Sequence, residues 1–417
     1  MARNMKDSGI EWIGEIPEGW EVATIGHLFS VTAGGDAKPH LYSFVQDTEH
    51  PYPVYTNSSN PNQIYAYTSA PIFNENTITV TGRGDIGHAF YRSTKFDAII
   101  RLLVLAPKSA LDCRYYAYWI DNVSIFFTNS AAVGQLSAQQ ISPYKTCYLP
   151  LCEQHSIANH LDFYCSKIEH ILAEIQNSIQ EYKKLKQAVI TQAVTKGVRG
   201  EREMKDSGNP WFGQIPTDWK LSRVGLHFSI ILGKMLCNAP LNDTYTLEPY
   251  YCAADVHFDG VADGERKKMW FSPIEKDLYR VSVGDLLVVE GGAGAGGSAI
   301  VENQDSYTYI QNSIMIVRSK GNTDNRYLRY LLEFLVKQGY IDIVCNKATI
   351  PHFTKDKLSG VPFCLCPTGE QKEIADYLDA KCAEIDRLIA KKEQLVKELE
   401  CYKKSLIYEV VTGKREV

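Results

Sequence analysis

The sequence has no hydrophobic run long enough to cross a membrane. No window of 18 apolar residues occurs, and the first residues, Met1 to Asn4, do not begin an apolar signal core. We therefore expect a cytoplasmic protein without a membrane segment. The chain also lacks an excess of basic charge, since charged residues make up 22% of its 417 residues and the formal net charge is −5. That balance excludes a strongly basic protein that binds nucleic acid through charge alone.

The cysteine spacing of a metal knuckle or a disulfide framework is also missing. The eleven cysteines are scattered, and Cys364 and Cys366 flank a single residue, as alternate positions of a strand do. His155 and His160 are five residues apart and have no set of carboxylates around them. We expect reduced thiols, most of them buried, and no metal site.

Motifs of the common catalytic sites are absent as well. The chain has no Walker loop, no His-Glu-x-x-His, no Gly-x-Ser-x-Gly, and no Asn/Asp-Pro-Pro-aromatic segment of the kind that binds a flipped base in amino-methyltransferases. Asp255, Asp259 and Asp263 are four residues apart in a glycine-rich setting, which is typical of solvated surface. Together these absences predict a protein without catalytic activity of its own.

What the chain does contain is an internal repeat. Segment 153–197 returns as 370–413, and both copies open with Glu-Gln and Ile-Ala-x-x-Leu-Asp and close on Val-Thr before a glycine. The motif Trp-x-Gly-x-Ile-Pro-x-x-Trp occurs at 12–20 and again at 211–219; we call it the tryptophan motif. A repeat this clear predicts two halves, each with a leading segment, a middle domain and a long helix.

Each copy of the repeated segment predicts a long helix with an apolar stripe. Apolar or aromatic residues recur every seven positions from Leu161 to Val189, and the same frame runs from Leu378 to Leu406 with Lys392 as the single polar intrusion. An exposed stripe would lose about 0.8 kcal/mol per CH₂ group, so each helix needs a partner. We expect the other copy to be that partner, although a homodimeric coiled coil is the alternative.

The two middle segments are predicted to be mostly β-structure with a few helices. Runs of β-branched and aromatic residues are punctuated by Gly, Pro and Asn, as in 53–57 and 307–310. The fold class is therefore α+β, with a pseudo-two-fold relation between the halves. The predicted bounds are 1–150 and 200–367 for the middle domains, and 151–199 and 368–417 for the helices.

Each middle domain carries a Gly-x-Gly-x-x-Gly loop, at 82–87 and at 292–297. In a dinucleotide-binding protein this motif opens a helix, but here both loops continue as strand. Two interpretations stay open. One is a tight β connection, and the other is a backbone that approaches a phosphate or a groove edge, with Arg83 and His88 able to reach out.

A duplicated pair of divergent domains on one rod suits a ligand that has two separated parts. A helix of about 40 residues is roughly 60 Å long, and duplex DNA rises about 3.4 Å per base pair. A spacer of roughly 50 to 60 Å therefore covers about fifteen to eighteen pairs. We expect two half-sites separated by a gap that is not contacted.

Over its whole length the chain resembles the specificity subunit of type I restriction-modification systems. The resemblance is carried by the tryptophan motif, by the Leu-Pro…Glu-Gln-x-x-Ile-Ala-x-x-Leu-Asp opening of each helix, and by the two variable domains between them. It implies that each middle domain is a target recognition domain for one half of a bipartite DNA site. It also implies that the two helices pack antiparallel as a coiled-coil spacer, from whose symmetry Lys392 departs.

The resemblance further implies partner subunits. Two modification subunits would bring S-adenosylmethionine and the methyltransferase chemistry, and restriction subunits would bring ATP- and Mg-dependent translocation and cleavage. Neither a cofactor nor a catalytic residue is expected in this chain. The partners would wrap the DNA and supply positive charge, which would reconcile base recognition with the net charge of −5.

Base recognition in either groove uses Arg, Lys, Asn, Gln and Ser side chains from loops. The residues that we select in the first domain are Lys38, Asn57, Ser58, Asn60, Arg83 and His88. Those in the second domain are Lys234, Asn238, Arg266, Lys267, Lys268, Lys347 and His352. The alternative to DNA recognition is a coiled-coil assembly adaptor whose two β domains bind protein. A self-contained nuclease-methylase is disfavoured by the missing motifs.

Overall fold

The computed structural model describes residues 3–124, 126, 135–303, 307–345 and 351–417. The chain forms two compact units, one made of 1–176 with 393–417 and the other of 177–392. Each unit unites one mostly-β domain with parts of both long helices, so the α+β class is confirmed. The domain bounds given above stay a prediction. No helix in the described part of the chain is long and apolar enough to span a membrane.

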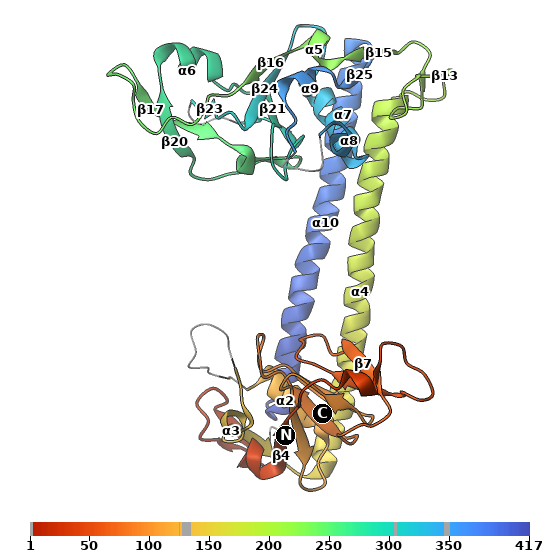
Figure 1. The fold of residues 1–417 in the computed structure, drawn as a ribbon, viewed down its shortest axis with the longest axis vertical. Coiled ribbons are helices and arrows are strands. Elements are labelled where there is room, and N and C mark those ends of the chain that lie inside the picture. The colour runs from red at the N-terminus through yellow and green to blue at the C-terminus, as the bar shows by residue number, and fades with distance from the viewer. Residues whose placement is uncertain (1–2, 125, 127–134, 304–306, 346–350) are drawn as a thin grey trace. The chain divides into compact units, whose positions relative to one another are not determined.

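The two repeated segments form the long helices α4 (Leu151–Lys196) and α10 (Thr368–Val411). In the second unit, Lys186 on α4 bonds Asp386 on α10 at 2.6 Å, and Arg199, just beyond α4, bonds Glu373 at 2.7 Å. Numbers that rise along α4 therefore fall along α10. In the first unit Lys403 bonds Glu169 at 2.6 Å, and the end of α10 shares a core with the start of α4. The predicted antiparallel pairing is confirmed in each unit (Figure 1).

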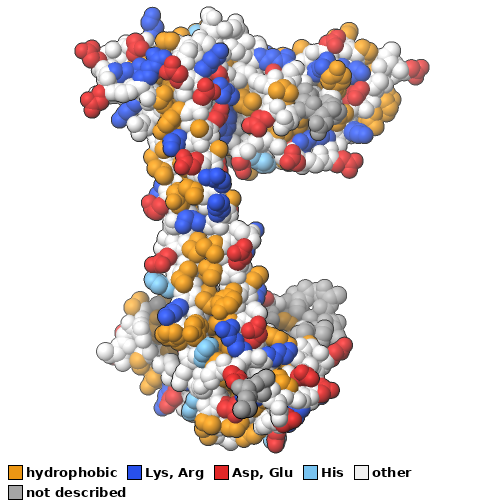
Figure 2. All heavy atoms as spheres, turned by 180° about the vertical axis from the view of Figure 1, so that it is seen from behind, with side chains coloured by type: hydrophobic (Ala, Val, Ile, Leu, Met, Phe, Trp, Pro, Cys, Tyr) orange, Lys and Arg blue, Asp and Glu red, His pale blue; other side chains and the backbone are white. Residues whose placement is uncertain are grey.

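The apolar stripe of the helices is buried only in part. Leu161, Ile168, Ile175 and Ile179 are at most 8% exposed, whereas Leu185, Leu395 and Tyr402 are between 43% and 48% exposed. The prediction that the stripe is covered by the partner helix was wrong at these three positions. Lys392 is half-buried, and its amine lies 5.7 Å from the centre of the Tyr182 ring, a favourable position for a cation. Pairing therefore leaves hydrophobic side chains on the outer surface of the helices, as Figure 2 shows.

The first β domain is built on two four-stranded sheets. The central sheet has the order β4 (Phe29–Ala33), β11 (Leu103–Pro107), β8 (Thr77–Val80) and β9 (Ala89–Arg92). The other sheet has the order β10 (Asp97–Ala98), β6 (Tyr52–Tyr55), β7 (Ile64–Thr68) and β5 (Tyr42–Ser43). Two short ribbons pair β1 (Met5–Asp7) with β2 (Glu15–Pro17), and β3 (Glu21–Thr24) with β12 (Lys145–Tyr148). The helical segments are α1 (Ile25–Leu28), η1 (Pro39–Leu41), α2 (Cys113–Asn122) and α3 (Ala138–Ile141).

The second β domain repeats this plan. Its central sheet has the order β16 (Phe228–Leu232), β24 (Ile314–Ser319), β21 (Leu286–Val289) and β22 (Ser298–Ile300). Beside it are the sheet of β20 (Lys267–Phe271), β17 (Thr246–Tyr251) and β23 (Tyr309–Ile310) and the pair β18 (Val256–His257) and β19 (Gly260–Val261). The ribbons are β13 (Met204–Asp206) with β14 (Gln214–Pro216), and β15 (Lys220–Arg223) with β25 (Pro362–Leu365). The helical segments are α5 (Val224–His227), η2 (Ala253–Asp255), α6 (Pro273–Tyr279), α7 (Asn325–Lys337), α8 (Tyr340–Val344) and α9 (Lys355–Ser359).

Helices α2 and α7 fasten the β domains to the long helices with matching bonds. Asp112 caps α2, and Arg114 in its first turn bonds Asp162 on α4 at 2.8 Å, while the Tyr118 hydroxyl donates to the same carboxylate at 2.9 Å. Asp379 on α10 has the same role in the second unit, where Arg326 and Tyr330 on α7 donate to it at 2.7 and 2.8 Å. The repeat therefore extends to these individual hydrogen bonds.

All eleven cysteines are free thiols, and seven of them are buried. Burial raises the pKa of the Cys113, Cys147 and Cys364 thiols to about 12, so these groups are poor nucleophiles. We expect an aromatic disulfide reagent at about pH 8 to modify the exposed Cys152 and Cys401 rapidly in the folded protein and the buried thiols only after unfolding. The double variant Cys152→Ser/Cys401→Ser should lose the fast phase, and rapid modification of all thiols would contradict the buried assignment.

Candidate nucleic-acid interface

Three loops of the first domain meet at one end of its central sheet. They are the loop after β6 (56–63), the β8–β9 connection (81–88) and the β10–β11 turn (99–102). Asn57 joins them, because its side-chain oxygen accepts a hydrogen bond from the Gly82 amide at 2.8 Å and its NH₂ group donates to the Ile100 carbonyl. We call these three segments the apical loops of the first domain. Side chains from distant parts of the sequence therefore share one surface.

The second domain has the same arrangement. Its apical loops are 252–255 after β17, 290–297 between β21 and β22, and 311–313 between β23 and β24. Ser313 joins them, since its hydroxyl accepts from the Ala253 amide at 3.1 Å and its carbonyl accepts from the Glu290 amide at 2.8 Å. The skeleton is shared, but the side chains that hold it and project from it differ between the domains.

The two glycine loops do not correspond residue by residue. Val80 pairs with Leu103 in the first central sheet, and Val288 pairs with Met315 at the same place in the second. This register sets Glu290, not Gly292, at the position of Gly82. The two loops therefore share the Gly-x-Gly-x-x-Gly sequence but do not occupy equivalent positions in the two domains.

Both glycine loops are tight β connections. The Gly87 amide donates to the Thr81 carbonyl at 2.9 Å, and the Gly296 amide donates to the Val289 carbonyl at 3.0 Å. The strands β9 and β22 follow directly, so neither loop opens a helix. The first of the two interpretations above is confirmed, and close approach to a phosphate stays a prediction.

The residues selected in the first domain gather in or beside its apical loops. The Asn57 side chain is hydrogen-bonded to the backbone of Gly82 and Ile100, and the Ser58 hydroxyl donates to Gln63 at 2.6 Å. Asn60 and Arg83 are exposed, and Arg83 has no side-chain partner among the described residues. His88 lies between Asp85 and Asp121, at 3.1 and 3.3 Å. Lys38 is exposed at the start of η1.

The residues selected in the second domain are more scattered. His352 lies at the apical loops, where it pairs with Gly291 in a β-bridge and approaches Glu290 at 3.5 Å. Asn238, Lys267 and Lys268 are exposed, the two lysines on β20. Lys347 lies outside the described residues.

Two of the selected cations are engaged inside the second domain. The Lys234 amine is buried, and it bonds Glu275 at 2.6 Å and the Trp270 carbonyl at 2.8 Å. Arg266 bonds Asp255 at 3.2 Å. The expectation that Lys234 projects from an exposed loop was therefore wrong. Its amine is buried because it forms an ion pair with Glu275, a carboxylate distant in sequence. Whether the other selected residues contact DNA stays a prediction.

Sequence reasoning missed two residues of the apical loops. Arg101 is exposed in the β10–β11 turn, and Glu290 places a carboxylate, 18% exposed, beside His352. The only sequence signal for Arg101 is its position between two apolar runs. For Glu290 the signal was obscured by the apparent match of the glycine loops. Within the described part of the chain, no group of His, Cys, Asp and Glu side chains could hold a metal ion.

The tryptophan motifs lie at the ends of the long helices rather than in the apical loops. The Trp20 indole N–H donates to Glu153 at the start of α4 at 2.9 Å, and Arg3 donates to the same carboxylate at 2.6 Å. In the second unit the Trp219 indole donates to Glu370 at the start of α10 at 3.2 Å, and Arg202 pairs with that carboxylate. We call each set of Trp, Arg and Glu a helix clamp.

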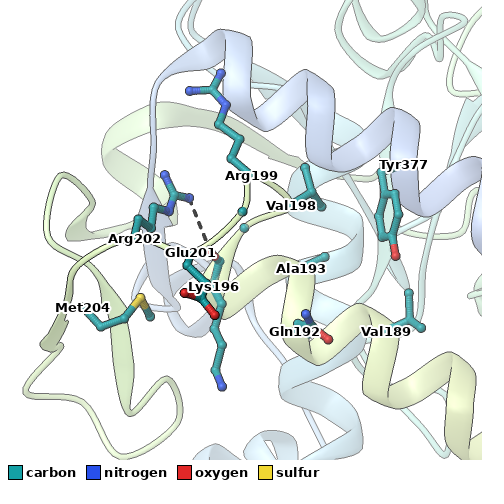
Figure 3. Close-up of a pocket in the computed structure, with 12 residues that line it drawn as sticks. Val189, Gln192, Ala193, Lys196, Val198, Arg199, Glu201, Arg202, Met204 and Tyr377 are labelled. Carbon is teal, nitrogen blue, oxygen red and sulfur yellow. Dashed lines mark hydrogen bonds between the residues drawn. The ribbon is translucent and has the colours of Figure 1, made fainter.

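The second helix clamp borders a pocket of about 640 Å³ at the end of α4. Residues 197–203 form the linker between α4 and β13. Figure 3 shows the Arg199 and Arg202 side chains extending from this linker on the side away from the Lys196 amine. Arg202 also donates to the Lys196 carbonyl at 3.4 Å, and Arg199 is bonded to Glu373. The two guanidinium groups are therefore engaged in holding the linker to α10.

The chain matches the family model described as the type I restriction modification DNA specificity domain over residues 17–181 and 217–398. A Mycoplasma pneumoniae protein named as a type I specificity subunit is 29% identical over 156 residues, which are 36% of this chain and 46% of that protein. A Methanocaldococcus jannaschii protein named as a type I restriction enzyme specificity subunit is 28% identical over 333 residues, 76% of this chain and 72% of that protein. The chain thus matches just under half the length of the first relative.

A solved structure has a similar fold. It comes from work on complex assembly and conformational transition of the type I R-M system. The superposition covers 95% of this chain and 98% of the solved chain, with a TM-score of 0.71. The sequence identity is 14%, so this likeness supports the fold alone.

Proposed function

Because the chain belongs to the type I restriction modification DNA specificity family, we propose that it is the DNA-recognition subunit of a type I restriction-modification complex. The observation that carries the proposal is the pair of apical loop sets, which share one skeleton and differ in side chains. A protein that reads two different half-sites needs this combination, because the skeleton sets the approach to the groove and the side chains choose the bases. Each domain reads one half of a bipartite target.

The helix pair is the surface on which we place the modification subunits. In the first unit Phe163, Ile171, Leu395 and Tyr402 are between 43% and 53% exposed, and in the second unit Leu185 is 48% exposed. Apolar side chains that gather into one contiguous exposed patch mark interaction surfaces. Figure 2 shows such side chains on the outside of the helices. Since both units carry part of this surface, each would bind one modification subunit.

In this proposal the chain is not catalytic. S-adenosylmethionine, ATP and Mg act in the modification and restriction subunits, and this chain directs adenine methylation or restriction to one sequence. The comparisons favour this function over a protein-binding adaptor.

The test is methyl transfer with and without partners. The chain purified alone should transfer no methyl group to DNA, whereas its complex with the modification subunits and S-adenosylmethionine should methylate adenine at one bipartite sequence. Binding of that duplex should weaken steeply with salt, as phosphate contacts require. A duplex that carries only one half-site is the control and should bind far more weakly. Methyl transfer by the chain alone, or a complex indifferent to DNA, would contradict the proposal.

A further inference from the structure

The β10–β11 turn of the first domain holds two residues in the left-handed region. Ile100 has φ 54° and Arg101 has φ 57°, and Asn76 is the other non-glycine residue with positive φ in the described part of the chain. This conformation is costly for isoleucine, because its branched side chain crowds the following carbonyl. Strain of this kind persists only where the surrounding structure imposes it, and it gathers at functional sites.

The surroundings of the turn do impose it. The Ile100 amide donates to the Gly35 carbonyl at 3.0 Å, the Arg101 amide donates to the Gly34 carbonyl at 3.2 Å, and Asn57 donates to the Ile100 carbonyl. Gly82 is part of the same packing, since a Cβ there would lie 3.2 Å from the Arg101 carbonyl and 2.8 Å from that of Leu136. The backbone of the turn is therefore fixed by three other segments.

The hydrogen bonds that fix the turn use its backbone atoms, and the side chains of Ile100 and Arg101 are exposed to solvent. Ile100 is 46% exposed and Arg101 is exposed. The Arg101 guanidinium has no partner among the residues that the structure describes, whereas Arg92 in the same domain is buried and donates to Thr79 at 2.9 Å. Arg101 thus has a fixed backbone and a guanidinium group that is available to a ligand. Because the backbone is already ordered, less conformational entropy is lost on binding.

The second domain lacks this feature at the same place. The Asn312 amide donates to the Lys234 carbonyl at 2.8 Å, as Ile100 does to Gly35, but neither Asn312 nor Ser313 has positive φ. No arginine occupies the turn. The strained arginine turn is therefore a property of the first domain, as a determinant of one half-site must be.

We infer that Arg101 determines base specificity in the first half-site. Its planar guanidinium would donate two hydrogen bonds to one base, in the way arginine bonds O6 and N7 of guanine in the major groove. The inference rests on the proposed function, because it names a residue that reads DNA within the proposed first half-site.

The test uses the complex with modification subunits and a set of duplexes in which each base pair of the first half-site is varied. Arg101→Ala should weaken binding of the preferred sequence by about 5- to 150-fold and abolish the preference at one position. Preferences in the second half-site should not change. Arg101→Lys keeps the charge but not the paired donors, so it should lose the same preference. Arg101→Gln gives the same comparison if the alanine variant does not assemble.

The matched control is Lys95→Ala, which removes an exposed positive charge between β9 and β10, at the end of β9 away from loop 81–88. It should leave every base preference unchanged. Unaltered preferences in Arg101→Ala would overturn the inference. So would an equal loss on all sequences with a smaller salt dependence, which is the result of a lost phosphate contact. A wild-type complex that shows no sequence-dependent methylation would instead refute the proposed function itself.

Discussion

Replacement of Arg202 by alanine is expected to destabilise the second unit by about 3–5 kcal/mol, the usual cost of removing one partner of a buried ion pair. The Glu370 side chain is 0% exposed and accepts from Arg202 and from the Trp219 indole. Without Arg202 its nearest cation would be Arg199, at 3.8 Å, and the Trp219 indole N–H would be its remaining side-chain donor among the described residues. Urea unfolding, combined with hydrogen exchange of amides in 177–392, measures the loss and assigns it to this unit.

The first helix clamp supplies the matched control. Arg3→Ala removes the same interaction from Glu153, but there both side chains are 33% exposed. Water can hydrate the carboxylate that remains, so we expect a loss of about 1 kcal/mol or less. Equal losses in the two variants would contradict the argument that burial of the acceptor sets the cost.

The helix clamps show which part of the fold the sequence could predict. Trp20 and Glu153 recur as Trp219 and Glu370, and each pair makes one hydrogen bond that fixes a helix end. A residue type that is needed for one specific contact recurs wherever that contact recurs. For this reason the repeat and the pairing of its two long helices could be predicted from the sequence, whereas their antiparallel direction was implied by the family resemblance.

The burial of individual helix positions could not be predicted in the same way. A seven-residue period assigns Leu185 and Tyr402 to the apolar stripe, but both are 48% exposed. The period specifies which residues share a face of one helix. How much of that face is covered depends on the second helix and on the β domain packed beside it.

The candidate interface was predictable in outline but not in detail. The sequence indicated that Asn57 and Arg83 lie on loops, and the structure brings both to one surface. It could not indicate that the Asn57 amide is used by Gly82 and Ile100, or that Lys234 meets Glu275, because these partners are distant in sequence. Loop cations look alike in a sequence whether they bind a carboxylate of the same chain or a ligand.

Replacement of Gly413 by alanine is expected to destabilise the first unit by about 2–5 kcal/mol. Gly413 follows α10 with φ +73°, a conformation that costs other residues about 1–2 kcal/mol. The added methyl group would also meet the Pro17 ring, with Cδ at 2.6 Å, and the Trp20 ring at 3.1 Å. Overpacking of this kind costs about 1–3 kcal/mol. Urea unfolding followed by tryptophan fluorescence measures the sum.

Gly14→Ala separates the two contributions. Gly14 belongs to the same unit and has φ +70°, but no atom lies within 4 Å of the position that its Cβ would take. This variant should therefore lose only the backbone contribution of about 1–2 kcal/mol. Equal losses in Gly413→Ala and Gly14→Ala would show that the end of α10 does not pack against the tryptophan motif. Because Gly197 at the end of α4 has φ +77° and faces Trp219, a larger loss for Gly413→Ala would predict the same sensitivity at Gly197.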